Sequence, residues 1–339
     1  SGKGATYVFG EAGNDDVILN TGPLLAKDLI DLGAGTDTLT LNTAGNTMVL
    51  RGVENLTLTK LAIGANKINS ADSAVAVTAK VAGNVVNIDG LTAGSTFTTV
   101  KDVATATAGT NLTVKFANTE AASTLTLGAG VNGTVETDKI TAVTINAADI
   151  LGDDTDTFTF KAATSVTING TKDVKGVVTA SATPADNKLE NLTITSSEEI
   201  NMGNTANVAA LKTVTATATK AATLGTIDSK ILTDVSVSST TLAAKVGNIS
   251  ASAASTTAVN VTVAGATTAE VGTINAFAAG KLGDVNVTAT KGLLTADAIK
   301  ATEAGTINLT STADSIKLLN TGIVAADTTG ITENMAAAK

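Results

Sequence analysis

A short pattern of an apolar, a small polar and an apolar residue recurs along most of the chain. In the second half, the first apolar residues of successive copies are 21 to 26 residues apart, with a mean of about 23, a period typical of solenoid proteins. Because side chains alternate between the two faces of a β-strand, each copy is expected to be a short strand with one apolar and one polar face. The copies lie at residues 142–145, 165–168, 191–194, 213–216, 234–237, 258–261, 284–287 and 306–309.

A second apolar signature lies about half a period after the first, at residues 224–227, 246–249 and 271–274, so each repeat carries at least two short strands. If successive coils stack at roughly 4.8 Å per layer, the apolar positions form an interior column and the polar positions an exterior one. This pattern predicts an all-β parallel β-helix, or β-solenoid. The alternative is a chain of β-sandwiches, which also have short strands and frequent turns. The exterior column would contain Thr144, Thr167, Thr193, Thr215, Ser236, Asn260, Asn286 and Asn308.

The spacing of the pattern suggests three segments. Residues 1–60 contain Gly- and Asp-rich turns, and residues 141–339 contain the regular repeat. Candidate strands at 75–77, 112–114 and 125–127 are spaced less evenly. We therefore expect residues 61–140 to be an irregular β-rich segment, for which an added β-sandwich-like part is one possible form.

Composition restricts the chemistry of the chain. Val, Ile and Thr, which are favoured in strands, recur throughout, whereas the 339 residues include no Cys, His or Trp. Without Cys there is no disulfide, so loops depend on packing or on metal ions. The formal net charge of -9 disfavours nucleic acid, whose phosphates attract clustered Lys and Arg, and suits cation binding. No apolar run of about 18 residues is present, so we expect no membrane span.

Two segments near the start match the calcium-binding nonapeptide G-G-x-G-x-D-x-U-x, in which U is apolar. Residues 10–18 match it with only the second glycine replaced, and residues 32–40 keep the Gly-x-Gly-x-Asp-x-apolar part. The glycines permit a tight turn that aims backbone carbonyls inward, and the Asp supplies a carboxylate, which are the oxygen ligands that Ca²⁺ prefers. A third, more eroded copy contains Asp153 and Asp156, with Asp154 at the position of Gly35. The alternative is that all three are Gly- and Asp-rich turns without an ion.

These nonapeptides are those of RTX proteins, and the chain resembles the RTX-type surface-layer (S-layer) proteins of Gram-negative bacteria. The resemblance rests on the nonapeptides, on the Thr/Ala/Val-rich composition without Cys or His, and on residues 35–39 followed by 53–58. It implies that Ca²⁺ folds a β-roll and bridges lattice contacts, that export uses a type I system, and that the coat is held on lipopolysaccharide. Transferred by position, Asp15 and Asp37 would be the carboxylate ligands. Backbone oxygens would come from turns that include Gly10, Ala12 and Asn14 in the first copy and Gly33 and Gly35 in the second.

The spacing of the two copies departs from a regular β-roll. Two nonapeptides make a coil of about 18 residues, but Asp15 and Asp37 are 22 residues apart. An insertion around Thr21 must therefore loop out, or the two turns do not share an ion. The neighbouring acidic residues either complete the shell of the ion or form a solvated acidic rim; they are Glu11, Asp16, Asp28 and Asp31.

An enzymatic role is not expected, because acid–base or nucleophilic chemistry would fall on Asp, Glu, Lys, Ser or Tyr alone. The pairs Asp153/Asp154 and Glu198/Glu199 could nominally serve a glycosidase, but we expect them to be turn or surface charges. We therefore expect a fragment of an extracellular structural protein that binds copies of itself in a calcium-dependent surface layer. Lipopolysaccharide would be a partner through a region outside the fragment. The alternative function is an RTX adhesin or toxin repeat region that acts as a binding module.

Overall fold

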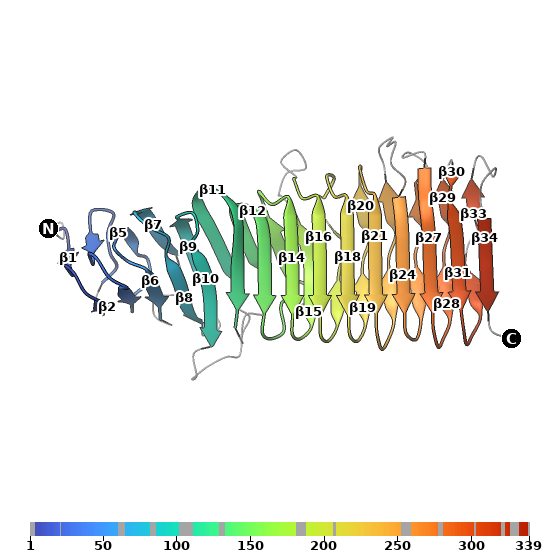
Figure 1. Cartoon of the computed structure of the whole chain (residues 1–339), viewed down its shortest axis with the longest axis horizontal. Helices are drawn as coiled ribbons and strands as arrows, with labels where there is room; N and C mark the ends of the chain where they lie inside the picture. The colour runs from blue at the N-terminus through green and yellow to red at the C-terminus, as the bar shows by residue number, and fades with distance from the viewer. Residues whose placement is uncertain are drawn as a thin grey trace. The chain divides into compact units, whose positions relative to one another are not determined.

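The structure, a computed structural model, is an array of parallel β-strands (Figure 1). Within the residues that it describes, every regular element is a strand, which confirms the expected all-β parallel β-solenoid. The β-sandwich alternative is wrong for these residues, because sandwiches are built from antiparallel sheets. The chain divides into two compact units, residues 1–152 with 159–163 and residues 153–158 with 164–339. The described residues are 4–20, 22–59, 65–81, 86–101, 111–128, 133–180, 188–205, 208–251, 259–276, 281–301, 303–319, 323–325 and 332–337.

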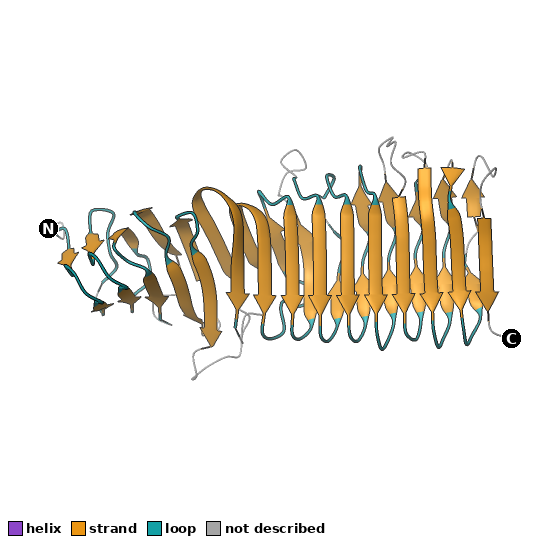
Figure 2. Ribbon diagram, viewed as in Figure 1, coloured by secondary structure: helices purple, strands orange, loops and turns teal. Residues whose placement is uncertain are grey.

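Coils of the first unit contribute strands to two parallel sheets (Figure 2). One sheet contains β1 (Tyr7–Phe9), β3 (Leu29–Asp31), β5 (Thr47–Arg51), β7 (Ala65–Ala71) and β9 (Val86–Leu91). The other contains β2 (Asp16–Leu19), β4 (Thr38–Leu41), β6 (Asn55–Leu58), β8 (Ala76–Val81) and β10 (Thr96–Lys101). The longer β11 (Leu112–Leu127) and β12 (Val135–Ala147) extend through both sheets. The described residues between 65 and 140, for which an irregular segment was expected, thus belong to the same two sheets.

The second unit has three parallel sheets. The longest strands form the first sheet, which contains β14 (Ser165–Gly170), β16 (Asn191–Ser196), β18 (Thr213–Ala218), β21 (Asp234–Ser239), β24 (Val259–Gly265), β27 (Lys281–Ala289), β31 (Thr306–Ser311) and β34 (Thr332–Ala337). The second contains β15 (Val174–Thr179), β17 (Ile200–Met202), β19 (Ala222–Leu224), β22 (Ala244–Val246), β25 (Ala269–Val271), β28 (Leu294–Ala296) and β32 (Ile316–Leu318). The third contains β20 (Ile227–Ser229), β23 (Ile249–Ala251), β26 (Ile274–Asn275), β29 (Ile299–Ala301) and β33 (Ile323–Ala325). Two further strands are β13 (Thr157–Phe160), which falls at the division between the units, and β30 (Glu303–Ala304), which pairs with β27.

The interior of each unit is filled by the alternate apolar residues that the sequence pattern marks. In the first sheet of the second unit, Val214, Val235 and Val261 are directly paired and each is 0% exposed. Burial of such a side chain contributes about 1.5–3 kcal/mol, and a parallel sheet brings the side chain of each coil against its neighbours. The interior column predicted from the sequence is therefore the main source of stability.

One part of the predicted register is wrong. The sequence pattern placed Val259 beside Val235, but the structure pairs Val235 with Val261 and Ser236 with Thr262. Asn260 pairs with Asp234 instead, and Ala258 lies outside the described residues. The exterior column next to Ser236 is thus continued by Thr262.

Among the described residues, we find no helix whose length and hydropathy would allow it to cross a membrane.

Candidate metal centre

The two Gly- and Asp-rich turns of the first unit stack directly on each other. One turn joins β1 to β2 and the other joins β3 to β4. Gly13 N donates a hydrogen bond to Ala34 O, and Ala34 N donates to Glu11 O, each at 2.9 Å. Ala12 and Ala34 form an isolated parallel bridge. The spacing of 22 residues therefore does not separate the turns.

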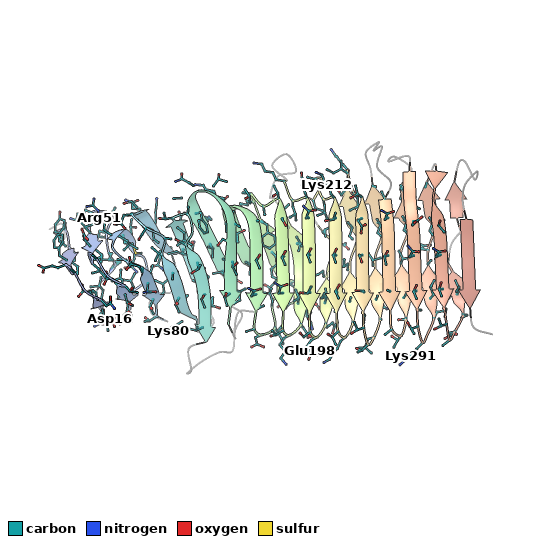
Figure 3. The ribbon with its side chains drawn as sticks, viewed as in Figure 1. Asp16, Arg51, Lys80, Glu198, Lys212 and Lys291 are labelled. Carbon is teal, nitrogen blue, oxygen red and sulfur yellow. The ribbon has the colours of Figure 1, made fainter. Side chains whose placement is uncertain are left out.

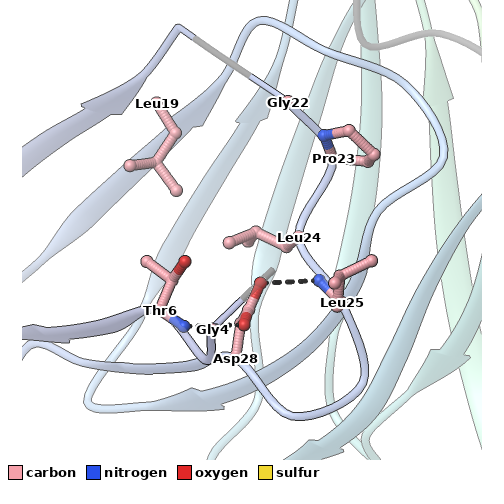
Figure 4. A pocket seen from close by; sticks show the side chains of 8 residues that line it. All are labelled: Gly4, Thr6, Leu19, Gly22, Pro23, Leu24, Leu25 and Asp28. Carbon is pink, nitrogen blue, oxygen red and sulfur yellow. Dashed lines mark hydrogen bonds between the residues drawn. The ribbon is translucent and has the colours of Figure 1, made fainter. Parts of the chain in front are cut away.

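The additional residues of this coil are accommodated at its opposite end, after β2. Residues 22–28 form a loop there, and Thr21 lies outside the described residues. Asp28, 3% exposed, accepts hydrogen bonds from Thr6 N at 2.8 Å and from Leu25 N at 2.7 Å (Figure 4). Its two carboxylate oxygens thus fasten the loop beside a pocket of about 180 Å³ that Pro23 and Leu25 help to line. Asp28 is a structural residue of the loop and lies away from the Gly- and Asp-rich turns.

Glycine is required in the stacked turns for steric reasons. A Cβ atom on Gly35 would lie 1.8 Å from Gly13 O, and one on Gly33 would lie 1.6 Å from Glu11 O. A Cβ on Gly10 would lie 2.5 Å from both Asp15 Oδ2 and Leu32 O. The carboxylate and the carbonyl oxygen therefore converge on space that a side chain would otherwise fill.

Glu11 takes the place of the missing second glycine and keeps its backbone conformation. Its φ is 82°, and Gly33, which stacks on it from the next coil, has a φ of 84°. A left-handed conformation costs a residue with a Cβ about 1–2 kcal/mol, whereas glycine adopts it freely. The first turn is thus the more strained of the two.

Acidic residues from three successive coils form a column, which we call the acidic column: Asp15, Asp37 and Glu54. Asp15 N donates a hydrogen bond to Asp37 Oδ1 at 2.7 Å, and Asp37 N donates to Glu54 Oε2 at 2.8 Å. The turn before Glu54 is shorter than the one before Asp37, but Asn55 pairs with Thr38, so Glu54 and Asp37 stand at equivalent positions just before their strands. Glu54 was not predicted as a site residue, although Gly52-Val53-Glu54 before an apolar strand is a shortened form of the same signal.

The acidic column contains two buried oxygens without a partner. Asp15 Oδ2 and Asp37 Oδ2 are inaccessible to solvent and accept no hydrogen bond from the described residues, and Asp37 is 0% exposed. An unpaired buried carboxylate oxygen is unfavourable by several kcal/mol unless a cation or a proton neutralises it. Ionised carboxylates stacked in one column also repel one another. The arrangement suits an oxygen-coordinated cation between the turns.

The remaining predicted ligands of the first unit lie beside the acidic column. Asn14 Oδ1 accepts a hydrogen bond from Thr36 N at 2.9 Å, which fastens one turn to the next. Asp16 is exposed at the start of β2 (Figure 3). Asp31 is half-buried and is paired with Arg51 in the β3–β5 register, while its carbonyl oxygen accepts a hydrogen bond from Gly10 N.

The three Asp side chains of the third copy of the motif lie in the second unit and accept hydrogen bonds. Asp153 Oδ1 accepts hydrogen bonds from Thr155 N at 2.8 Å and Thr155 Oγ1 at 2.7 Å. These bonds hold the pKa of Asp153 below its ordinary value. Asp156 Oδ2 accepts a bond from Asp153 N, and Asp154 Oδ1 accepts one from Asn201 Nδ2. Backbone and side-chain donors thus reach at least one oxygen of each of these three carboxylates.

No cluster of three or more His, Cys, Asp or Glu side chains with metal-binding geometry occurs in the described part of the chain. A site between two stacked turns needs fewer side chains, because most of its ligands would be carbonyl oxygens. Glycine-lined turns and unpartnered carboxylate oxygens are thus the features that single out the turns of Asp15 and Asp37. A scan against protein-family models and searches of curated proteins and of solved structures found no match to this chain.

Proposed function

We propose that this chain is a non-enzymatic structural segment of an extracellular bacterial surface layer, and that Ca²⁺ stabilises its fold. The observation that carries the proposal is the pair of buried, unpartnered oxygens, Asp15 Oδ2 and Asp37 Oδ2, in stacked glycine turns. Asp15 and Asp37 would hold the ion together with carbonyl oxygens of the turns. One candidate is Leu32 O, because Leu32 O and Asp15 Oδ2 both lie 2.5 Å from the position that a Cβ atom on Gly10 would take. When bound, Ca²⁺ supplies two positive charges that offset the charges of the acidic column.

The chain's own residues determine how much a bound ion would add to folding stability. The glycines keep the turns close, and the bonds from Asp15 N and Asp37 N orient the next carboxylate of the column. Because the unfolded chain has no preformed site, binding of the ion adds directly to folding stability. Calcium sites of extracellular modules have dissociation constants of about 10⁻⁴–10⁻³ M. With an affinity in that range, the fold would depend on calcium outside the cell.

A coat function is supported by the kind of scaffold on which the site lies. Each unit is a β-solenoid in which every coil contacts only its neighbours. Its surface repeats from coil to coil, and a repeating surface suits regular contacts with many identical copies. The alternative of a dispersed RTX adhesin or toxin repeat region uses the same scaffold, so the state of assembly distinguishes the two.

Electron microscopy of the purified chain with millimolar CaCl₂ and with excess EGTA tests the proposal. We expect ordered sheets or patches with calcium and dispersed particles after chelation, with MgCl₂ at equal ionic strength as the control. A chain that folds with calcium but stays dispersed at all concentrations would contradict the coat function and favour the binding module.

A further inference from the structure

One face of the second unit carries fewer charged side chains than its other faces. We call it the Thr/Asn face: three alternate outward-facing residues from each of β14, β16, β18, β21, β24, β27 and β31. All of its residues are Thr, Ser or Asn except Asp234, Asp284 and Ala264. The face consists of the first, third and fifth residues of 165–169, 191–195, 213–217, 234–238, 260–264, 284–288 and 306–310.

The other two sheets of the same unit carry outward-facing charged side chains, so the fold of these coils tolerates charged residues on a sheet surface. Lys245, Glu270 and Lys317 point outward from the second sheet, and Asp228 and Lys300 point outward from the third. Charged residues near the Thr/Asn face lie at its margins, either in the connections between strands, as Lys212, Glu198 and Lys291 do (Figure 3), or at the start of a strand, as Lys281 of β27 and Glu303 of β30 do. The absence of Lys, Arg and Glu is therefore specific to one face.

Hydrogen bonds between coils fix the side chains of this face. Thr195 Oγ1 donates to Asn169 Oδ1 at 2.9 Å and Thr213 Oγ1 donates to Asn191 Oδ1 at 2.8 Å. Asn308 Nδ2 donates to Asn286 Oδ1 at 2.8 Å. Side chains that are already ordered lose little conformational entropy when a partner covers them. The strands run nearly parallel in the view of Figure 2, so these side chains repeat at the strand spacing from coil to coil.

We infer that the Thr/Asn face binds the same face of a second copy of this chain. Two arguments select a copy over other partners. The chain has a net charge of -9, so two copies repel each other over most of their surfaces, and a nearly uncharged face is where they can approach. The spacing of side chains along the face is also set by the strand spacing, and a second copy has the identical spacing, so ladders of small polar side chains can pack against each other coil by coil.

The area of the face is sufficient for such a contact. Seven strands at about 4.8 Å and six residues at about 3.3 Å give about 34 Å by about 20 Å, or roughly 670 Å² per copy. Standard protein interfaces bury about 800 Å² per partner. The contact is isologous, with a two-fold axis, so residues at the centre of the face lie near their own counterparts. Ser236 is that central residue, because β21 is the fourth of the seven strands and Ser236 is the middle position of the three.

The chain has no Cys, so single Cys variants report this contact directly. We expect Ser236→Cys to give a covalent dimer with a short bismaleimide cross-linker in calcium. The matched control is Ser250→Cys, another half-exposed outward serine on β23 of the same unit, which should give little dimer. Equal cross-linking of the two variants, or cross-linking at Ser250→Cys alone, would overturn the inference.

A charge introduced into the face provides an independent test. Thr215→Lys places two like charges near each other across the two-fold axis, and we expect its self-association constant, measured by sedimentation equilibrium, to fall about tenfold or more. Thr223→Lys on β19, where the same residue type points outward from the second sheet, should change it less than twofold. If Thr215→Lys folds, as verified by circular dichroism, and its self-association constant is unchanged, the inference is contradicted. A wild type that stays monomeric and binds a neutral polysaccharide at this face would contradict it as well.

The inference deepens the proposed function, and the two can fail separately. If calcium-dependent sheets form but Ser236→Cys gives no cross-link, the coat function is supported and the Thr/Asn face is not a lattice contact. Covalent dimers of Ser236→Cys without sheets would support the face-to-face contact and contradict the coat function.

Discussion

At the scale of single residues, the described part of the first unit contains strain and unpaired charge that the described part of the second unit lacks. Glu11 holds a left-handed backbone conformation, and Asp37 is buried with one oxygen unpartnered. In the second unit, Asp153 accepts several hydrogen bonds within its own turn. Strained residues and unpaired buried charges persist where a function requires them, which is why the calcium hypothesis rests on the first unit.

Replacing Glu11 by glycine should stabilise the protein by about 1 kcal/mol, because glycine adopts the left-handed conformation without a steric penalty. Urea unfolding in calcium measures the change. Glu11→Gln is the control, since it removes the charge but keeps the Cβ atom, and we expect it to be nearly neutral. Equal stabilisation by both substitutions would assign the effect to charge and not to the backbone.

Asp37→Asn should have opposite consequences with and without calcium. In calcium, the variant should lose most of the calcium-induced rise in Tm, because one carboxylate ligand is gone. In EGTA it should be at least as stable as the wild type, because a neutral amide replaces a buried charge in the acidic column. Asp16→Asn, at an exposed position, should change neither value. A wild-type calcium response in Asp37→Asn would exclude this carboxylate as a ligand.

The turn of Asp153 allows a pH prediction. Hydrogen bonds from Thr155 lower the pKa of Asp153, so the ionised carboxylate stabilises the fold above the pKa of the unfolded chain. This stabilisation is lost as the pH falls through the lower pKa of the folded state. Thr155→Val should raise the pKa of Asp153 towards its ordinary value, as measured by carboxyl carbon NMR. The difference in unfolding free energy between wild type and variant should also shrink towards zero in strong acid. A difference that is independent of pH would contradict this account.

At the scale of strands, the alternation of apolar and polar residues predicted the fold class but gave a wrong register in one coil. Residues 259–263 read Val-Asn-Val-Thr-Val, and a shift of two residues returns every side chain to the same face. The sequence pattern therefore could not choose between Val259 and Val261 as the partner of Val235. The third sheet was not predicted either. The second signature, interpreted as one strand at residues 224–227, spans the corner between the end of β19 at Leu224 and the start of β20 at Ile227.

A pair of introduced cysteines tests this register. Ser236→Cys with Thr262→Cys places directly paired residues of β21 and β24 within the Cα separation of about 4.4–6.8 Å that a disulfide needs. We expect this variant to form an intramolecular disulfide on mild oxidation, as detected by mass spectrometry of the monomer. Ser236→Cys with Asn260→Cys should not form one, and the reverse outcome would restore the register predicted from the sequence.

The candidate site was predictable in part. The nonapeptide motif predicted the glycines, Asp15 and Asp37, because the backbone geometry of the turn limits which residue types can occupy those positions. Glu54 was not predicted, because its coil has a shorter turn that no longer matches the motif. Asp28 and Asp153 resemble ligands in the sequence, and only the structure shows which backbone donors they bind.

At the scale of the whole molecule, acidic side chains lie in two different surroundings. In both units, Lys from an adjacent coil contacts Glu, as in Lys115 with Glu136 at 3.8 Å in the first unit and Lys212 with Glu190 at 2.8 Å in the second. The carboxylates of the acidic column, which lies in the first unit, stack on one another instead. Exposed ion pairs contribute little to stability, but they remove the need for an added cation. The calcium dependence should therefore arise in the first unit.

Differential scanning calorimetry in millimolar CaCl₂ and in excess EGTA, at equal ionic strength, tests the central claim most directly. A ligand at one hundred times its dissociation constant adds about 2.7 kcal/mol to folding stability. We predict a Tm that is several degrees higher with calcium, that is not reproduced by MgCl₂, and that loses its calcium dependence when Asp15 and Asp37 are both replaced by Asn. The same Tm in calcium and in EGTA would contradict a calcium ion between the stacked turns.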